Sequence, residues 1–183
     1  MFRFIDFTLA FIGLCGTLPF TIFILFSLII TGSRPIFKQK RLGKDKIEFT
    51  LYKFRTMKLD TQNEATHLVS SSQITVLGHL LRKSKLDELP QLWNVLNGEM
   101  SLVGPRPCLI NQHELIKERS KLGIFSVKPG ITGLAQINKI DMSIPKYLAK
   151  KDAQMISTLS FSKYFYYIYM TILGKGRGDQ VKY

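Results

Sequence analysis

The chain of 183 residues suits one compact domain with an accessory element, and its length excludes two full domains. Its 26 lysines and arginines against 13 acidic residues give a formal charge of +13, so its partners should be acidic: nucleic acid, anionic lipid headgroups or phosphorylated small molecules. Its two cysteines lie far apart and one sits inside an apolar run, which argues against a disulfide or zinc site and for a reducing compartment.

The first element is a membrane anchor, because residues 7–30 contain no charged side chain. A helix of this length would measure ~36 Å, enough to cross a bilayer. Pro19 lies in the middle, where proline removes a backbone hydrogen bond and clashes with the preceding turn, so the helix should bend or break. A kinked spanning helix and a re-entrant hairpin both fit this pattern. Arg34 and Lys38 predict that the C-terminal side is cytoplasmic.

A β-hairpin should follow, with strands at residues 35–41 and 47–57 around a turn at residues 43–45. Lys53 and Arg55 continue the apolar face of the second strand. These two basic side chains either meet solvent and headgroups or project into a phosphate site, and the pattern alone leaves both interpretations open.

Residues 58–72 are polar and predict a mobile loop. Thr75 should cap a helix that runs to residue 83, and its expected buried face consists of Val76, Leu77, Leu80 and Leu81. Arg82 near the end of this helix would complement the negative end of the helix dipole. That role needs no ligand.

Two adjacent carboxylates, Asp87 and Glu88, come next. Pro90 is tolerated only in a first turn, so a helix should begin near the dyad, bury Leu89, Leu92, Trp93 and Leu96, and end at Gly98. One interpretation makes Asp87 a helix N-cap and Glu88 a first-turn acid. The other uses the same dipole and the surrounding basic residues to keep a carboxylate ionised, so that it can bind a divalent cation or attack phosphorus.

Two loops carry further candidates. In residues 104–107 two prolines brace Arg106, which suits bidentate phosphate recognition, although a rigid turn with a solvated arginine is the alternative. Residues 128–133 contain two glycines and could cradle a phosphate through backbone amides.

Three more helices are predicted towards the C-terminus. The first starts at a capping box formed by Asn111 and Glu114 and ends before Gly123. The others cover residues 143–157 and 162–173. The last is rich in tyrosine on more than one face, which is typical of a membrane interface, and the basic tail at residues 175–182 fits anionic lipid.

The motifs K-F-R-T-M, R-x-x-x-L-D-E-L-P-Q-L-W-N-V-L-N-G-E-M-S-L-V-G-P-R-P and K-P-G-I-T-G-L-A-Q-I-N resemble the bacterial sugar transferase family, from residue 4 to about residue 172. These are small monotopic phosphoglycosyl transferases. The resemblance implies an α+β, mostly helical fold with a re-entrant membrane helix broken at Pro19 (residues 1–33), a small β-hairpin and amphipathic interfacial helices. Residues 34–183 would form a membrane-associated catalytic domain on the cytoplasmic face of the bacterial inner membrane. The resemblance also implies the minimal form of the family, without further spanning helices before the anchor.

The function implied is transfer of a sugar-1-phosphate from a UDP-sugar to undecaprenyl phosphate, with release of UMP. Asp87 would be the nucleophile that forms an aspartyl-phosphosugar, and Asp87 with Glu88 would bind Mg²⁺. The implied phosphate-binding residues are Lys53, Arg55, Arg82 and Arg106. The implied nucleotide or sugar contacts are Pro129, Gly130, Thr132 and Gln136. By analogy, the sugar should be an N-acetylated amino hexose.

The chain departs from the family pattern in three places. Leu18 precedes Pro19 where the family has serine, and Thr17 is the expected substitute for the lost hydroxyl. Lys139 and Ile140 replace a common Gly-Arg, and Leu134 stands where tryptophan is frequent. The alternative function is a membrane-tethered module that binds anionic lipid or nucleic acid without catalysis; an acidic dyad within a basic surface argues against it, so nucleic acid is not expected as a partner.

Overall fold

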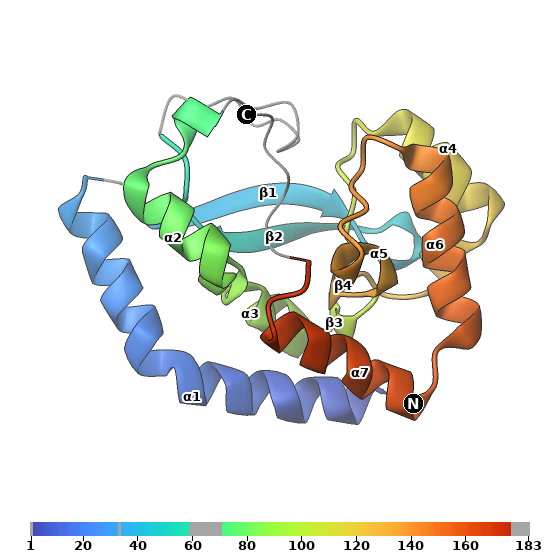
Figure 1. Ribbon diagram of the computed structural model, residues 1–183, viewed down its shortest axis with the longest axis horizontal. Coiled ribbons are helices and arrows are strands. Elements are labelled where there is room, and N and C mark those ends of the chain that lie inside the picture. Colours follow the sequence, from blue (N-terminus) through green and yellow to red (C-terminus); the bar gives the residue numbers. More distant parts are fainter. Residues whose placement is uncertain (1, 33, 59–70, 177–183) are drawn as a thin grey trace.

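The computed structural model describes residues 2–32, 34–58 and 71–176 (Figure 1). A long helix, α1 (Arg3–Ile30), runs beneath a body and rises along one side of it. The body combines a hairpin and a two-stranded parallel sheet with short helices, so the expected mostly helical α+β class is confirmed. The remaining helices are α2 (Val76–Ser84), α3 (Gln91–Leu96), α4 (His113–Lys121), α5 (Leu134–Ile137), α6 (Pro145–Thr158) and α7 (Phe161–Ile172). The 3-10 turns are η1 (Lys44–Lys46), η3 (Ser71–Gln73), η4 (Leu86–Glu88) and η5 (Ile124–Ser126).

The predicted hairpin is present as β1 (Ile36–Leu42) and β2 (Glu48–Phe54), with Ile36 opposite Phe54 and Leu42 opposite Glu48. Its turn contains Asp45 in the left-handed region at φ 53°. The inner face buries Phe49 and Leu51 in a cluster with residues of α1 and α3. β2 ends at Phe54, so Arg55 lies just beyond the strand that was expected to include it.

Helix α1 is continuous through Pro19 and bends partway along its length, so the expected break is a bend within one helix (Figure 1). The Thr17 hydroxyl donates to the carbonyl of Gly13 at 2.7 Å. Proline at position 19 deprives the carbonyl of Cys15 of its helical donor. The compensation expected from Thr17 is therefore wrong, because its hydroxyl serves a carbonyl half a turn earlier.

The N-terminal end of α1 is held on the body through Asp6, a buried carboxylate. Its Oδ1 accepts hydrogen bonds from Ser101 Oγ at 2.9 Å and from the backbone N–H of Leu102 at 2.8 Å. The hydroxyl of Tyr164, which is fully buried in α7, donates to the same oxygen. Three segments far apart in the sequence therefore meet at one carboxylate.

The C-terminal end of α1 rests on the same body. Ile24 and Leu28 are buried in a cluster with Phe54 and Leu81. Between the two ends, large apolar side chains are exposed: Phe11, Ile12, Leu18, Phe20, Ile22 and Phe23. Among the described residues, α1 is the one helix long and apolar enough to cross a membrane, by length and composition.

A second sheet was not foreseen. Strand β3 (Ser101–Val103) pairs in parallel with β4 (Gly130–Thr132), so the expected turn-rich loop at residues 128–133 contains a strand. The strands approach so closely that a Cβ on Gly130 would lie 2.0 Å from the Gly104 nitrogen. The glycines that suggested a turn instead permit close contact between two backbones.

Of the two predicted helix caps, the structure confirms the cap of α2 and contradicts the cap of α4. Thr75 caps α2 as predicted, accepting a hydrogen bond from the Gly78 N–H at 3.0 Å. Its expected apolar face is only partly buried, because Val76 is 91% exposed and Leu80 is 62% exposed. The predicted Asn111 capping box is wrong: α4 begins at His113 and has no side-chain cap.

The tyrosines of α7 divide between two environments. Tyr164 and Tyr167 are buried, whereas Tyr166 and Tyr169 are exposed, so a purely interfacial placement of all of them is wrong. Most of the predicted loop at residues 58–72 and most of the basic tail at residues 175–182 lie outside the described residues.

Candidate active site

The dyad of Asp87 and Glu88 ends the 3-10 turn η4, which follows α2 directly. Between α2 and η4, Lys85 adopts a left-handed conformation at φ 59°, which turns the chain. Helix α3 begins only at Gln91, and its N-cap is Pro90, without a side-chain hydrogen bond. The capping interpretation of Asp87 is therefore wrong, and the role of this nearly buried carboxylate has to come from its surroundings.

Two basic side chains from different elements converge on Glu88. Lys53 Nζ, from β2, lies 2.9 Å from Glu88 Oε1. The two terminal nitrogens of Arg106, from the loop after β3, each lie 3.5 Å from the same oxygen. The Lys53 and Glu88 side chains are each only 13% exposed. Partial burial lowers the effective dielectric constant, so these charges act on one another, and on a ligand, more strongly than at an open surface.

Arg82 lies next to this cluster in sequence and has an unused donor. Its Nε donates to Thr56 Oγ1 at 2.8 Å. Its terminal nitrogen Nη1 is buried without a hydrogen-bond partner among the described residues. A buried guanidinium N–H without an acceptor is costly, and an anionic oxygen would satisfy it.

Arg55 makes its described contacts away from the dyad. Its Nε donates to the Arg34 carbonyl at 2.9 Å, and its guanidinium lies 5.7 Å from the centre of the Phe37 ring. Partial burial, and then the neighbouring charge of Arg34, lower the pKa of Arg55. The structure thus brings Lys53 and Arg106 onto Glu88 but directs Arg55 towards β1 and the segment before it.

Lys85 joins the site, although the sequence interpretation gave it no committed role. Burial lowers its pKa, while the nearby carboxylates of Glu88 and Asp87 act in the opposite direction. Its Nζ donates to the carbonyl of Lys175 at 3.1 Å, beyond the end of α7. The run R-K-S-K before the dyad indicated basic surroundings, but the left-handed turn that directs this lysine inward carries no sequence signal.

The four expected nucleotide or sugar contacts lie around the loop that carries Arg106. Pro129 accepts from the Ser101 N–H at 2.8 Å, and Thr132 accepts through its carbonyl from the Gly104 N–H at 2.8 Å. Gln136 donates to the Gly104 carbonyl at 3.2 Å, while its own Oε1 is buried without a partner among the described residues. The Gly130 N–H is already bonded within the fold, so an amide cradle at this position is not formed; a ligand role for these residues stays a prediction.

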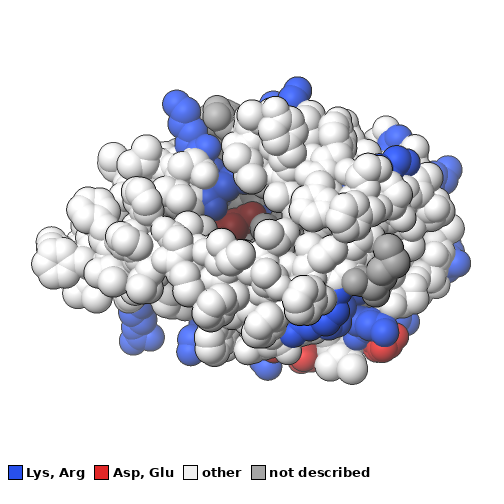
Figure 2. Space-filling model, turned by 90° about the horizontal axis from the view of Figure 1, so that it is seen from below, with Lys and Arg blue, Asp and Glu red and all other residues white. Residues whose placement is uncertain are grey.

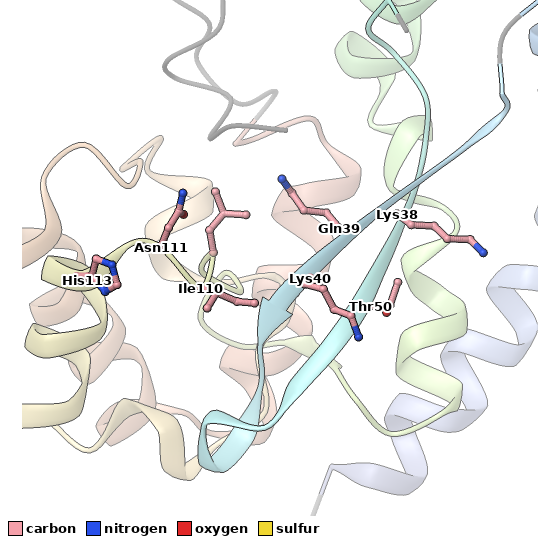
Figure 3. Close-up of a pocket in the computed structure, with 8 residues that line it drawn as sticks. Lys38, Gln39, Lys40, Thr50, Ile110, Asn111 and His113 are labelled. Carbon is pink, nitrogen blue, oxygen red and sulfur yellow. The ribbon is translucent and has the colours of Figure 1, made fainter. Parts of the chain in front are cut away.

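A pocket of about 600 Å³ lies elsewhere, between β1 and the segment leading into α4 (Figure 3). Lys38 and Lys40 line it, opposite Tyr52 and Thr50 in the hairpin, whereas Lys53 lies opposite Phe37. Successive strand residues point to opposite faces, so these two lysines project from the face opposite to that of Lys53. The residues that line the pocket include neither the dyad nor the basic side chains around it, so the pocket is separate from the site.

The face seen from below carries few charged side chains except near its edges, and a hollow in its middle contains acidic and basic side chains side by side (Figure 2). Helices α1 and α7 form the lower side of the molecule (Figure 1). Both expose large apolar residues, among them Phe23, Phe26, Phe161 and Ile172. The arrangement combines an apolar face with charged groups recessed behind it.

The chain is similar in sequence to known proteins over most of its length. A family model described as bacterial sugar transferase matches residues 1–176. The chain is 45% identical over 140 residues to an uncharacterized sugar transferase, EpsL, of Bacillus subtilis, a match that covers 74% of this chain and 67% of that protein. It is 38% identical over 174 residues to the galactosyl transferase CpsE of Streptococcus agalactiae, covering 86% of this chain and 38% of the relative.

A third relative is the UDP-glucose:undecaprenyl-phosphate glucose-1-phosphate transferase of Xanthomonas campestris pv. campestris. It is 38% identical over 153 residues, which cover 80% of this chain and 31% of the relative. The chain thus spans 67% of the first relative and well under half of the other two.

Proposed function

Because the chain belongs to the bacterial sugar transferase family, we propose that it transfers a sugar-1-phosphate from a UDP-sugar to undecaprenyl phosphate and releases UMP. The observation that carries this proposal is the convergence of Lys53 and Arg106 on Glu88, directly beside Asp87. Such a site can neutralise the phosphates of the donor while a carboxylate approaches phosphorus. Arg82 Nη1, which has no hydrogen-bond partner among the described residues, supports it, because this nitrogen offers one more donor to an anion.

In the first proposed step, a carboxylate oxygen of Asp87 attacks the phosphorus that carries the sugar. A bond forms between this oxygen and phosphorus, and the bond to the bridging oxygen of the diphosphate breaks. UMP leaves with the electron pair of that bond. The product is an aspartyl-phosphosugar, and Lys53 and Arg106 stabilise the negative charge on its phosphoryl oxygens.

In the second proposed step, a phosphate oxygen of undecaprenyl phosphate attacks the same phosphorus. The acyl phosphate bond to Asp87 breaks, the free carboxylate returns, and a diphosphate-linked sugar remains on the lipid. No net proton transfer is required, so the protein mainly aligns the two displacements and balances charge.

Magnesium is part of this proposal. The two carboxylates of Asp87 and Glu88 fit the ion, because Mg²⁺ is commonly bound through one or two carboxylates together with substrate phosphates and water. Among the described residues, no group of three or more acidic, histidine or cysteine side chains could hold a metal by itself. Bound at the dyad, the ion would neutralise charge that develops on the phosphoryl oxygens.

We also propose a monotopic topology on the cytoplasmic face of the inner membrane. Both ends of α1 contact the same body, through Asp6 at one end and through Ile24 and Leu28 at the other. A helix that crossed the bilayer would place its ends on opposite sides, so these contacts support a re-entrant anchor. The exposed apolar side chains between the ends would then lie in one leaflet. Labelling of a cysteine placed at residue 2 by a reagent confined to the periplasm would contradict this topology.

The donor sugar separates two versions of the proposal. The relatives in Streptococcus and Xanthomonas are named for galactosyl and glucose-1-phosphate transfer, which favours an unsubstituted hexose such as galactose or glucose. The analogy drawn from the sequence favours an N-acetylated amino hexose. A panel of UDP-glucose, UDP-galactose and their N-acetylated amino counterparts, scored by UMP release, distinguishes the two.

The central test measures UMP release by the purified full-length protein with undecaprenyl phosphate and Mg²⁺. Asp87→Asn should abolish turnover, whereas Asp45→Asn, in the exposed hairpin turn, should leave it unchanged. Full turnover by Asp87→Asn would refute the nucleophile assignment. Absence of UMP from every donor, with retained binding to anionic vesicles, would instead favour a membrane-tethered binding module.

A further inference from the structure

We propose that Arg41 and Arg119 are positioning residues that fix the backbone of residues 104–108 and thereby aim Arg106 at the phosphates of the donor. The proposal rests on the proposed function, because it assumes that Arg106 acts on a phosphoryl group. It assigns a catalytic purpose to two buried arginines that lie outside every motif used above.

The loop at residues 104–108 has all five of its carbonyls engaged in hydrogen bonds. Those of the first two residues accept from Gln136 Nε2 at 3.2 Å and from the Gly130 N–H at 2.8 Å. The Cys108 carbonyl accepts from the Leu42 N–H at 3.0 Å. The two carbonyls between them, of Arg106 and Pro107, are the ones that arginine side chains hold.

These two arginines come from different elements. Arg119 Nη1, from α4, donates to the Arg106 carbonyl at 2.7 Å. Arg41 Nη1, from β1, donates to the Pro107 carbonyl at 2.9 Å. Hydrogen bonds from a charged donor are about twice as strong as neutral ones. Most of this loop is buried, so its carbonyls need donors from the protein. Two consecutive carbonyls receive charged guanidinium donors, which restrict movement of the segment more than neutral donors would.

Each arginine is itself fixed before it reaches the loop. Arg119 is buried and donates through Nε and Nη2 to Asp152 Oδ2, at 3.0 and 2.7 Å. Arg41 is also buried, and its Nε donates to Gln39 Oε1 at 3.1 Å. The planar guanidinium allows one side to bind the supporting residue while the other reaches the loop carbonyl. A lysine ammonium lacks this fixed fork.

The consequence is that the backbone of Arg106 is fixed and its side chain alone can adjust to a ligand. This backbone is held on both sides by Pro105 and Pro107, whose φ angles are fixed, and by the hydrogen bonds to its own and the next carbonyl. The geometry needed for phosphoryl transfer is narrow, and a displacement of about 1 Å can cost about 100-fold in rate. Fixing the loop would keep Arg106 within that tolerance.

The test is a double-mutant cycle on UMP release. We expect Arg119→Lys and Arg41→Lys each to lower kcat about 10-fold in the wild-type background, since misplacement costs less than loss of the group. Arg106→Ala should lower it about 100-fold. In the Arg106→Ala background, adding either lysine substitution should change kcat less than about 2-fold, because there is no longer a guanidinium to aim.

A merely structural role would give the opposite result: each lysine substitution would reduce kcat by the same factor in both backgrounds, and that outcome overturns the proposal. Lys121→Met is the matched control, since it removes an exposed ion pair with Glu118 on the same helix and should change kcat in neither background. Thermal unfolding identifies folded variants. If Arg119→Lys does not fold, the Arg41→Lys cycle decides between the two outcomes. A wild-type protein without UMP release refutes the proposed function, whereas additive losses in an active protein refute only the positioning role.

Discussion

Asp6 offers a direct test of how the anchor is attached to the body. In Asp6→Ala three donors lose their acceptor: the Ser101 hydroxyl, the Leu102 N–H and the Tyr164 hydroxyl. A buried donor left unpaired costs ~1–3 kcal/mol, and water can reach part of this site once the carboxylate is removed. We therefore expect the free energy of unfolding to fall by roughly 3–6 kcal/mol, a large share of the ~5–15 kcal/mol typical of a domain.

The measurement is urea unfolding of the detergent-solubilised full-length protein, followed by tryptophan fluorescence and circular dichroism. Tyr164→Phe should cost about 1–2 kcal/mol, because it removes one donor and leaves two on the carboxylate. Tyr166→Phe is its control, an exposed tyrosine on the same helix whose change should stay within ~0.5 kcal/mol. A loss below about 1 kcal/mol for Asp6→Ala would refute the view that this carboxylate holds α1 in place.

Three further predictions follow from the site and its support. Lys53→Met should reduce UMP release about 100-fold, because it removes a cation from Glu88, whereas Lys44→Met in the exposed turn should not; equal rates for the two would remove Lys53 from the site. Gly130→Ala should prevent folding or abolish UMP release, since its Cβ would lie 2.0 Å from a backbone nitrogen; a folded, fully active variant would contradict the close pairing of β3 and β4. Cys108 is buried and burial raises the pKa of its thiol, so at pH 7 a maleimide should leave Cys108 unmodified in the native protein and label it only after denaturation, as read by mass spectrometry.

The sequence predicted those parts of the fold in which neighbouring residues decide the outcome. The alternation of apolar residues around a glycine-containing turn predicted the hairpin. Thr75 was predicted as a cap from its position before an apolar helical segment, and it bonds to an N–H three residues away. The dyad was identified as a candidate site from its two adjacent acids among basic residues. The cap and the hairpin turn depend on residues only a few positions apart, whereas Lys53 and Arg106 reach Glu88 from 35 and 18 positions away.

Contacts between distant segments could not be predicted in the same way. The pairing of β3 with β4 depends on the approach of Gly104 to Gly130, and a short glycine-rich segment indicates a turn equally well. The ion pair of Arg119 and Asp152 joins α4 to α6, and no spacing within either helix marks it. The dyad was expected at the start of a helix, but it belongs to a separate 3-10 turn that begins after the left-handed Lys85.

The apolar pattern of a helix also did not reveal whether its apolar face packs against the protein or lies exposed. Val76 and Leu80 follow helical spacing but are exposed, as are many side chains of α1. Tyr164 shows the reverse, because a residue expected at the membrane interface is buried against Asp6. Periodicity separates two sides of a helix, and it does not distinguish protein interior from lipid.

The hydrogen bond between Asp6 and Tyr164 joins residues 158 positions apart, which sets an order for assembly of the protein during synthesis. At ~5–20 residues per second, the ribosome would need about 8–32 s after making Asp6 to reach its partner in α7. The N-terminal end of α1 is therefore made before the other described helices and is among the last parts to be fixed, whereas Ile24 and Leu28 can pack earlier. During that interval its exposed phenylalanines and its carboxylate have to be accommodated by the membrane surface or a chaperone, so early release of the chain from either would favour aggregation.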